Sequence, residues 1–202
     1  MVATPHPGAS DSSKIGPNAI LQYLPVLADQ LGDVRMRALL NAARLAEMPD
    51  GSSMIDEAEV RRLHQTVRCA LPQSAPALAA RAGAATAQYI VRHRIPALVK
   101  PLLRWLPARL AERFLAKAIR QHAWTFVGSG EFRVASTSPL VFEITHNPLV
   151  RGEEATHTVC DWHAAVFSEL FTTLLGRRYM ACETHCEAFG ASVCRFEVEA
   201  SA

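Results

Sequence analysis

The sequence predicts an α+β protein in which several helices precede, and pack on, a roughly four-stranded antiparallel sheet. Apolar residues recur at helical spacing as far as about residue 121, and the alternation typical of strands begins only after Trp124. The segments between the expected strands are short, which favours antiparallel pairing. Half of the 202 residues are hydrophobic, enough for a substantial core. We therefore expect a helical layer early in the chain and a sheet completed at its end.

The first 13 residues differ in composition from the rest of the chain. They are rich in Pro, Ser, Ala and Gly and contain no apolar h-region, so they predict a disordered lead and not a signal peptide. Residues 14–202 are expected to form a single domain. No apolar run reaches the length of a membrane-spanning helix. We therefore expect a cytoplasmic protein that could contact a membrane peripherally and whose cysteines stay reduced.

Proline and glycine divide the helical region into successive elements. Pro25 should kink or split the first helix, Gly32 should end it, and Asp33 is placed to cap the next. The predicted helices cover residues 17–31, 33–45, 55–71, 77–94 and 107–121, with short helices between Pro96 and Pro107.

The helix expected over residues 77–94 is rich in alanine. Ala80, Ala84 and Ala87 give it a slim side that a neighbouring helix or a flat ligand could approach closely. Ordinary core packing is the simpler interpretation of this side.

The strands are expected in two pairs on either side of one more helix. Residues 131–135 and 140–145 alternate as strands, and residues 161–175 form a helix that Gly176 ends. Residues 178–186 and 192–199 then form a hairpin with a turn at residues 188–191.

Four of the five cysteines lie in the last stretch of the chain: Cys160, Cys182, Cys186 and Cys194. A metal site, buried thiols and disulfides all explain such a group. One ligand set consists of the four cysteines. The other replaces Cys182 with Glu183, and it requires a bulge near Thr184 and His185, because positions three apart face opposite sides of a flat strand.

The order Cys160, Glu183, Cys186, Cys194 resembles the zinc motif of the vinyl-4-reductase domain family. The resemblance covers residues 15–199 and includes the segments Ile15-Gly16-Pro17-Asn18 and His122-Ala123-Trp124-Thr125-Phe126. It implies a fold related to the small subunits of vesicle-tethering complexes and these four residues as zinc ligands, with Cys182 and His185 as extra donors nearby. Because a zinc ion with four protein ligands has no open position, we interpret this zinc as structural.

A basic segment precedes the sheet. Residues 92–120 include eight Lys and Arg residues and a single acidic residue, Glu112. One helical face carries four of these basic residues: Arg109, Arg113, Lys117 and Arg120. Such a face could bind an anionic membrane surface, an acidic protein or the propionates of a tetrapyrrole, or it could simply be solvated. The net charge of +2 gives no indication of a nucleic-acid partner, and none is expected.

The resemblance further implies a ligand pocket, because other family members bind small aromatic molecules. We expect it between the helices and the sheet, with a histidine as axial ligand to a magnesium porphyrin and arginines at its propionates. The candidate residues are His93, Trp105, Arg109, Arg113, His122, Trp124, Phe126, Phe142 and Trp162.

The family name implies a reductase, whereas the residues do not supply a cofactor cradle. Gly128-Ser129-Gly130 lacks the third glycine of a dinucleotide fingerprint and precedes a strand instead of opening a helix. Within the family the chain looks like the members that act in bacteriochlorophyll biosynthesis.

We therefore predict a carrier that hands magnesium-porphyrin intermediates between enzymes such as the magnesium chelatase and the methyltransferase. The alternative is an 8-vinyl (old 4-vinyl) reductase of divinyl chlorophyllide precursors; a ligand sensor is disfavoured by the lack of an attached DNA-binding or ATPase domain. The resemblance also implies a homodimer.

Overall fold

The computed structural model of the chain describes residues 13–45 and 47–201, so the predicted lead, apart from Ser13, lies outside the described residues. The helices are α1 (Asn18–Leu21), α2 (Tyr23–Ala42), α3 (Glu57–Ala70), α4 (Ala75–His93), α5 (Val99–Trp105), α6 (Ala108–Gln121), α7 (Trp124–Val127) and α8 (Asp161–Leu175), with a 3₁₀ turn, η1 (Glu187–Phe189). The strands are β1 (Lys14–Ile15), β2 (Ile55–Asp56), β3 (Glu131–Thr137), β4 (Leu140–Thr145), β5 (Tyr179–His185) and β6 (Cys194–Ala200).

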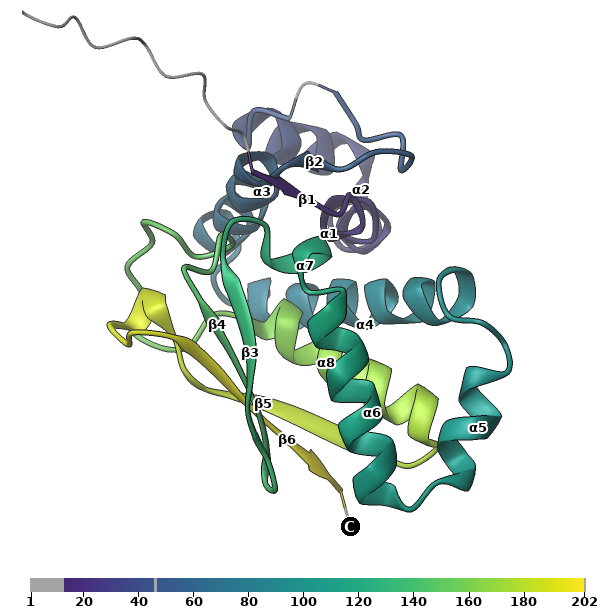
Figure 1. Ribbon diagram of the computed structural model, residues 1–202. Coiled ribbons are helices and arrows are strands. Elements are labelled where there is room, and N and C mark those ends of the chain that lie inside the picture. Colours follow the sequence, from purple (N-terminus) through teal and green to yellow (C-terminus); the bar gives the residue numbers. More distant parts are fainter. Residues whose placement is uncertain (1–12, 46, 202) are drawn as a thin grey trace, which may run out of the picture.

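The larger sheet has the order β3-β4-β6-β5, and every neighbouring pair in it is antiparallel. Helix α8 packs against β5 and against α4, and α6 packs against β3 (Figure 1). The α+β fold class predicted from the sequence is therefore confirmed, with helices first and the sheet completed by the last strand.

The predicted helices were correct in position, and the helix expected over residues 17–31 is split at Gln22 into α1 and α2, as predicted from Pro25. Pro25 lies in the first turn of α2, where a backbone N–H has no intrahelical acceptor to lose. A second break occurs at Gly32, whose φ of 73° and ψ of 162° interrupt the helical backbone. The helix expected over residues 55–71 starts at Glu57, because Ile55 pairs with Ile15 in a small separate sheet. Such two-residue strands carry no periodic signal.

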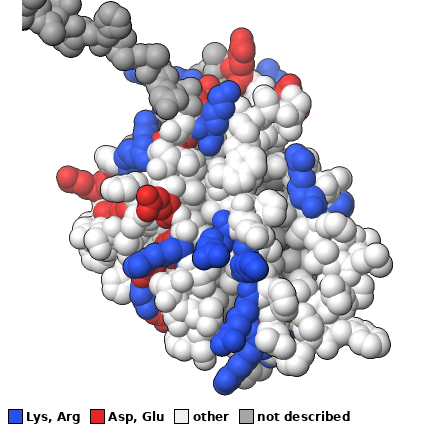
Figure 2. Space-filling model, viewed as in Figure 1, with Lys and Arg blue, Asp and Glu red and all other residues white. Residues whose placement is uncertain are grey.

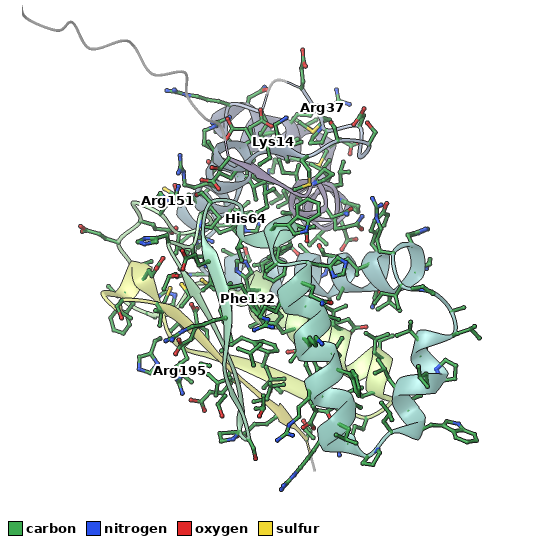
Figure 3. All side chains as sticks on the ribbon, in the orientation of Figure 1. Lys14, Arg37, His64, Phe132, Arg151 and Arg195 are labelled. Carbon is green, nitrogen blue, oxygen red and sulfur yellow. The ribbon has the colours of Figure 1, made fainter. Side chains whose placement is uncertain are left out.

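Aromatic side chains fill the space between α8 and the middle of the sheet, and the groove that α4, α8 and β5 form beside it is lined by none of the predicted pocket residues. The rings of Phe142 and Phe167 lie 5.0 Å apart, and those of Phe167 and Phe196 lie 5.4 Å apart. Phe132 lies in the same group, between β3 and the helices (Figure 3). Edge-to-face contacts of this kind add about 0.5–1.5 kcal/mol each to the burial of the rings.

Helices α4 and α8 approach each other closely at Gly83. A Cβ atom at this position would lie 2.3 Å from the carbonyl oxygen of Trp162 and 2.9 Å from the Cβ of Ala165. Both neighbours belong to the first turns of α8 and cannot swing away as a long side chain could. The close contact therefore depends on Gly83, which the prediction did not name; of the predicted side, Ala87 is buried, whereas Ala80 and Ala84 are half-buried and line a groove.

We predict that Gly83→Ala lowers the free energy of unfolding by roughly 1–3 kcal/mol, because the added methyl group overlaps the α8 backbone. At an open helical position the same change would instead stabilise by about 1 kcal/mol. Chemical denaturation followed by circular dichroism distinguishes the two signs. A higher denaturation midpoint for the variant would show that the α4–α8 contact is not close.

Candidate functional site

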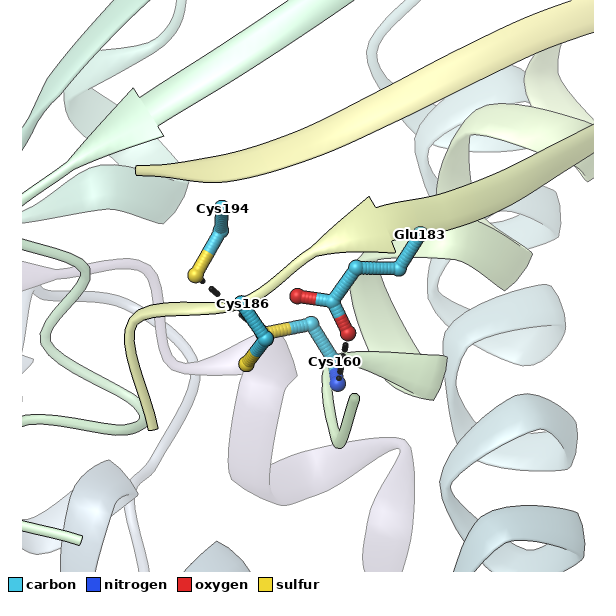
Figure 4. A group of neighbouring side chains, drawn as sticks. All are labelled: Cys160, Glu183, Cys186 and Cys194. Carbon is cyan, nitrogen blue, oxygen red and sulfur yellow. Dashed lines mark hydrogen bonds between the residues drawn. The ribbon is translucent and has the colours of Figure 1, made fainter. Parts of the chain in front are cut away.

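Four side chains with metal-binding atoms meet where α8 begins and the β5–β6 hairpin turns. One ligand atom from each of Cys160, Glu183, Cys186 and Cys194 lies within 4.8 Å of all the others. Figure 4 shows the four side chains pointing toward one another. Segments that are more than twenty residues apart in sequence therefore converge on one small volume.

Each side chain is positioned by a feature of the local backbone. Cys160 is the residue before α8, Cys186 follows the end of β5, and Cys194 opens β6 opposite Ile144. The pairing of β5 with β6 shifts between Glu183 and His185. The bulge that the Glu183 ligand set required is therefore present, and it turns Glu183 and Cys186 toward the same side.

The structure does not form the alternative set of four cysteines. Cys182 lies opposite Glu197 in the sheet and is exposed, as is His185. The Cys160, Cys186 and Cys194 side chains are buried.

The separations within the cluster suit a tetrahedral ion. The Sγ atom of Cys160 lies 3.9 Å from that of Cys186 and 3.7 Å from that of Cys194. Thiolates bound tetrahedrally at the usual zinc–sulfur distance lie roughly 3.8 Å apart. The three sulfurs are also free cysteines, with no disulfide among the residues described.

Glu183 is held with one oxygen satisfied and the other unpaired. Its Oε2 accepts a 2.7 Å hydrogen bond from the backbone N–H of Cys160, whereas its Oε1 is buried and has no partner. Burial raises the pKa of this carboxyl to about 8. A buried, unpaired carboxylate oxygen is costly, and a cation beside it would remove that cost.

The thiols also carry perturbed acidities. Burial, and then hydrogen bonds to the other two thiols, raise the pKa of Cys160 well above its usual value. Hydrogen bonds with Cys160 and Cys194 lower the pKa of Cys186 to about 2. Although its bond with Cys160 acts in the opposite direction, the pKa of Cys194 is raised by its bond with Cys186 and by burial. The three thiols are coupled, so without a cation the cluster as a group favours a single thiolate shared among hydrogen-bonded neighbours.

Sequence reasoning missed Asn147, which supports the cluster from outside. Its side-chain Nδ2 lies 3.4 Å from the sulfurs of both Cys160 and Cys194 and donates to them. Glu187 holds the backbone of Asn147, and the N–H of Glu187 itself donates to Cys194 at 3.5 Å. Donors of this kind orient and stabilise metal-bound thiolates. In the sequence Asn147 precedes Pro148 and indicates only a turn.

Three thiolates and one carboxylate fit a zinc ion better than an iron–sulfur cluster, which is held by thiolates, or a magnesium ion, which prefers oxygen ligands. Four ligands saturate a tetrahedral ion. The cluster could therefore hold one zinc that ties α8 to the hairpin and leaves no position open for a substrate.

The structure does not bring the candidate tetrapyrrole-binding residues into one cavity. Phe126 and Trp162 belong to the interior, where Trp162 is 3% exposed. Trp105 is 90% exposed on α5, far from a buried pocket. Phe142 is buried in the core. Five other candidates are exposed: His93 at the end of α4, Arg109 and Arg113 on α6, and His122 and Trp124 at the junction of α6 and α7.

His122 and Trp124 form the most ligand-like group among these candidates. The Nδ1 atom of His122 lies 2.9 Å from the carbonyl oxygen of Ala118. A carbonyl oxygen only accepts, so in the neutral ring Nδ1 carries the proton and Nε2 keeps its lone pair. Trp124, two residues on, is 58% exposed.

His163 is a second residue that the sequence did not single out. It is 1% exposed, and neither ring nitrogen has a hydrogen-bond partner. It packs among Trp162, Phe126 and Phe196, and its burial lowers its pKa to about 4. Its position on the buried side of the helix gives no signal that separates it from an ordinary core residue.

Comparison with known proteins agrees with this architecture and site. The vinyl-4-reductase domain family matches residues 140–200, which contain all four cluster residues. The bacteriochlorophyll synthase 23 kDa chain of Cereibacter sphaeroides is 47% identical over 191 residues, covering 95% of this chain and 93% of that one. The chain of the same name from Rhodobacter capsulatus is 42% identical over 194 residues, covering 96% and 90%. The protein therefore belongs to the family of vinyl-4-reductase domain proteins that includes these bacteriochlorophyll synthase 23 kDa chains.

Solved structures share the fold at low sequence identity. An H-NOX protein from S. oneidensis in an Fe(II)NO ligation state superposes with a TM-score of 0.60 and 10% identity, covering 93% of this chain and 100% of that one. An H-NOX protein studied for its heme distortion gives a TM-score of 0.56 and 12% identity, covering 93% and 96%. These likenesses establish the α+β fold alone.

We predict that each chain binds one zinc ion, and that substitution of a ligand removes this ion whereas substitution of a neighbouring residue does not. Glu183→Ala should lose the metal and much of the stability, because binding of a structural zinc contributes on the order of 10 kcal/mol at neutral pH. Cys182→Ala is the matched control, since this neighbouring side chain is exposed and turned away, and it should keep the metal. Elemental analysis of the purified proteins measures both. Iron in place of zinc, or the reverse pattern of loss, would contradict this assignment.

Proposed function

We propose that the protein acts in bacteriochlorophyll biosynthesis as a non-catalytic, zinc-containing carrier of magnesium-porphyrin intermediates. The observation that carries the proposal is its relationship to bacteriochlorophyll synthase 23 kDa chains over almost its whole length. The zinc stabilises the fold, and the exposed side chains of α6 and α7 bind the ligand.

The Gly128-Ser129-Gly130 segment, which lacks the pattern of a dinucleotide-binding loop, has a structural role. Gly128 has a φ of 52°, and a Cβ atom there would lie 2.2 Å from Oε2 of Glu57. The Ser129 N–H donates to the same oxygen at 2.7 Å, and Arg151 pairs with the other oxygen at 2.8 Å. This turn clamps a buried carboxylate, so its backbone donors are not free for a phosphate. That use supports a carrier over a reductase.

We place the macrocycle at the junction of α6 and α7. The free Nε2 of His122 suits an axial magnesium ligand, and the exposed ring of Trp124 suits one face of the macrocycle. Lys117 and Arg113 lie five and nine residues earlier on α6, and helical spacing places them on the other side of the helix from His122. The propionates would have to extend around α6 to pair with them. The shared fold with an H-NOX protein studied for its heme distortion is compatible with tetrapyrrole binding.

The proposed partners are the enzymes that precede and follow the bound intermediate, such as the magnesium chelatase and the methyltransferase. The proposed zinc site needs three reduced thiols, which fits the cytoplasm. No helix among residues 13–45 and 47–201 is long and apolar enough to cross a membrane.

We predict that the protein forms a homodimer through its helical layer, as its resemblance to paired sensor domains implies. Light scattering at tens of micromolar, a concentration at which a moderately stable dimer is populated, should give about twice the mass of one chain. A monomer at this concentration would contradict the pairing.

We predict that reversing the charges of the basic face with Arg109→Glu, Arg113→Glu and Lys117→Glu weakens binding of a dicarboxylate magnesium porphyrin by about ten- to a hundred-fold. Its dimethyl ester should be affected much less, because it lacks the propionate charges. His122→Ala should reduce the affinity of both ligands about ten-fold, with His93→Ala as the matched exposed control. Absorbance titration measures every affinity. Equal losses for acid and ester would show that the basic face is not the propionate site.

The reductase alternative has a direct assay. The wild-type protein is incubated with a divinyl chlorophyllide precursor and NADPH, reduced ferredoxin or reduced flavin. The carrier proposal expects the vinyl group to survive. Turnover with any of these reductants would replace the carrier with an enzyme.

A further inference from the structure

Helix α5 presents apolar side chains to solvent along its whole outer side. Leu98, Leu102 and Trp105 are 80%, 64% and 90% exposed. Their spacing of four and three residues places them on one side of a helix. Leu103, on the other side, is 7% exposed, and α5 packs against α8. The fold is thus secured by the inner side and gains little from the three exposed residues.

Helix α6 continues this exposed apolar surface. Leu110 and Phe114 are 43% and 56% exposed and share an outer side with Arg113 and Lys117. The two helices are consecutive and pack against each other at one corner of the molecule (Figure 1). We call Leu98, Leu102, Trp105, Leu110 and Phe114 the apolar corner.

The charge around the apolar corner is almost entirely positive. Eight basic residues lie between positions 92 and 120, and the one acidic residue is Glu112. That carboxylate is already used, since Arg177 pairs with it at 2.7 Å and Tyr179 donates to it at 2.7 Å. Figure 2 shows basic side chains over α6 and at the end of α4, and an uncharged surface at α5 in this view.

We propose that the apolar corner docks on an anionic lipid bilayer, with α5 in the interface and the basic side chains at the headgroups. An indole ring and leucines on a short, protruding helix suit shallow insertion. Neighbouring Lys and Arg side chains are attracted to anionic headgroups. The positive charge around the apolar corner is complementary to the negative charge of an anionic bilayer, and this favours such a bilayer as the binding partner.

Two other occupants fit less well. A second copy would bring the same positive charge against itself, so self-pairing would use another part of the helical layer. An acidic protein would have to enclose side chains that protrude on a convex corner, whereas protein hot spots are enclosed in well-packed pockets.

Vesicle sedimentation tests the proposal without any porphyrin, so its outcome is independent of the carrier function. The zinc-loaded, full-length protein is mixed with vesicles of phosphatidylcholine alone or with phosphatidylglycerol added. We expect binding to the anionic vesicles at low salt and release as salt rises. Replacing Leu98, Leu102 and Trp105 with Ser should reduce binding more than a hundred-fold. Replacing Arg94, Lys100 and Arg109 with Gln should reduce it on the order of a hundred-fold, about five-fold for each charge.

The matched control is the triple change Val34→Ser, Arg35→Gln and Arg37→Gln on α2. Val34 is 84% exposed and also stands beside exposed arginines, so the same kinds of change are made elsewhere on the surface. This variant should bind vesicles like the wild type. Circular dichroism establishes that each variant is folded.

Tryptophan fluorescence gives a second readout. Trp162 is buried, so a blue shift with anionic vesicles should disappear in Trp105→Phe and remain in Trp124→Phe. Failure of the wild type to sediment at low salt, or equal loss of binding in the α2 control, would overturn the proposal. The proposal would also be overturned if the wild type did not bind vesicles and the α5 variant changed its oligomeric state. That result would show that a second copy of the chain covers the apolar corner.

Discussion

The close packing of α8 between α4 and the sheet is the constraint on which the rest of the structure depends. The absent side chain of Gly83 lets the first turns of α8 lie against α4, while Phe167 and Phe171 on α8 fill the space toward the sheet. Because the interior is close-packed, α8 has little freedom to slide. The position of its first turn decides where Cys160 lies.

The cluster of Cys160, Glu183, Cys186 and Cys194 connects this fixed start of α8 to the β5–β6 hairpin. Three of its members come from the β5–β6 hairpin and one from the start of α8, so a bound ion would add to the hydrogen bonds that already join α8 to β5. The unpaired Oε1 of Glu183 and the crowded thiols are costly in the absence of a cation. If the cluster binds a metal, folding and metal binding should be coupled, as in small proteins with thiolate zinc sites.

Helices α5, α6 and α7 carry two different kinds of exposed surface. The α6–α7 junction combines an imidazole with a free nitrogen and an exposed indole, whereas α5 presents apolar side chains surrounded by positive charge. Neither group contributes much to the core, so both are free to serve binding. Helix α6, which has 14 residues and is about 21 Å long, separates the two groups.

The sequence by itself determined the fold class, most helix positions and the candidate metal ligands, with Cys182 and Glu183 as alternatives. These follow from local patterns: apolar periodicity, glycine at the end of α8, and three cysteines with a glutamate at a recognisable spacing. Only the tertiary structure decided between Cys182 and Glu183, because the register shift between β5 and β6 depends on pairing with a distant strand. It also replaced the predicted pocket with packed phenylalanines and placed Trp105 in solvent. Which apolar side chains face each other across the core depends on how α4, α8 and the sheet pack together, and no local pattern in the sequence records that packing.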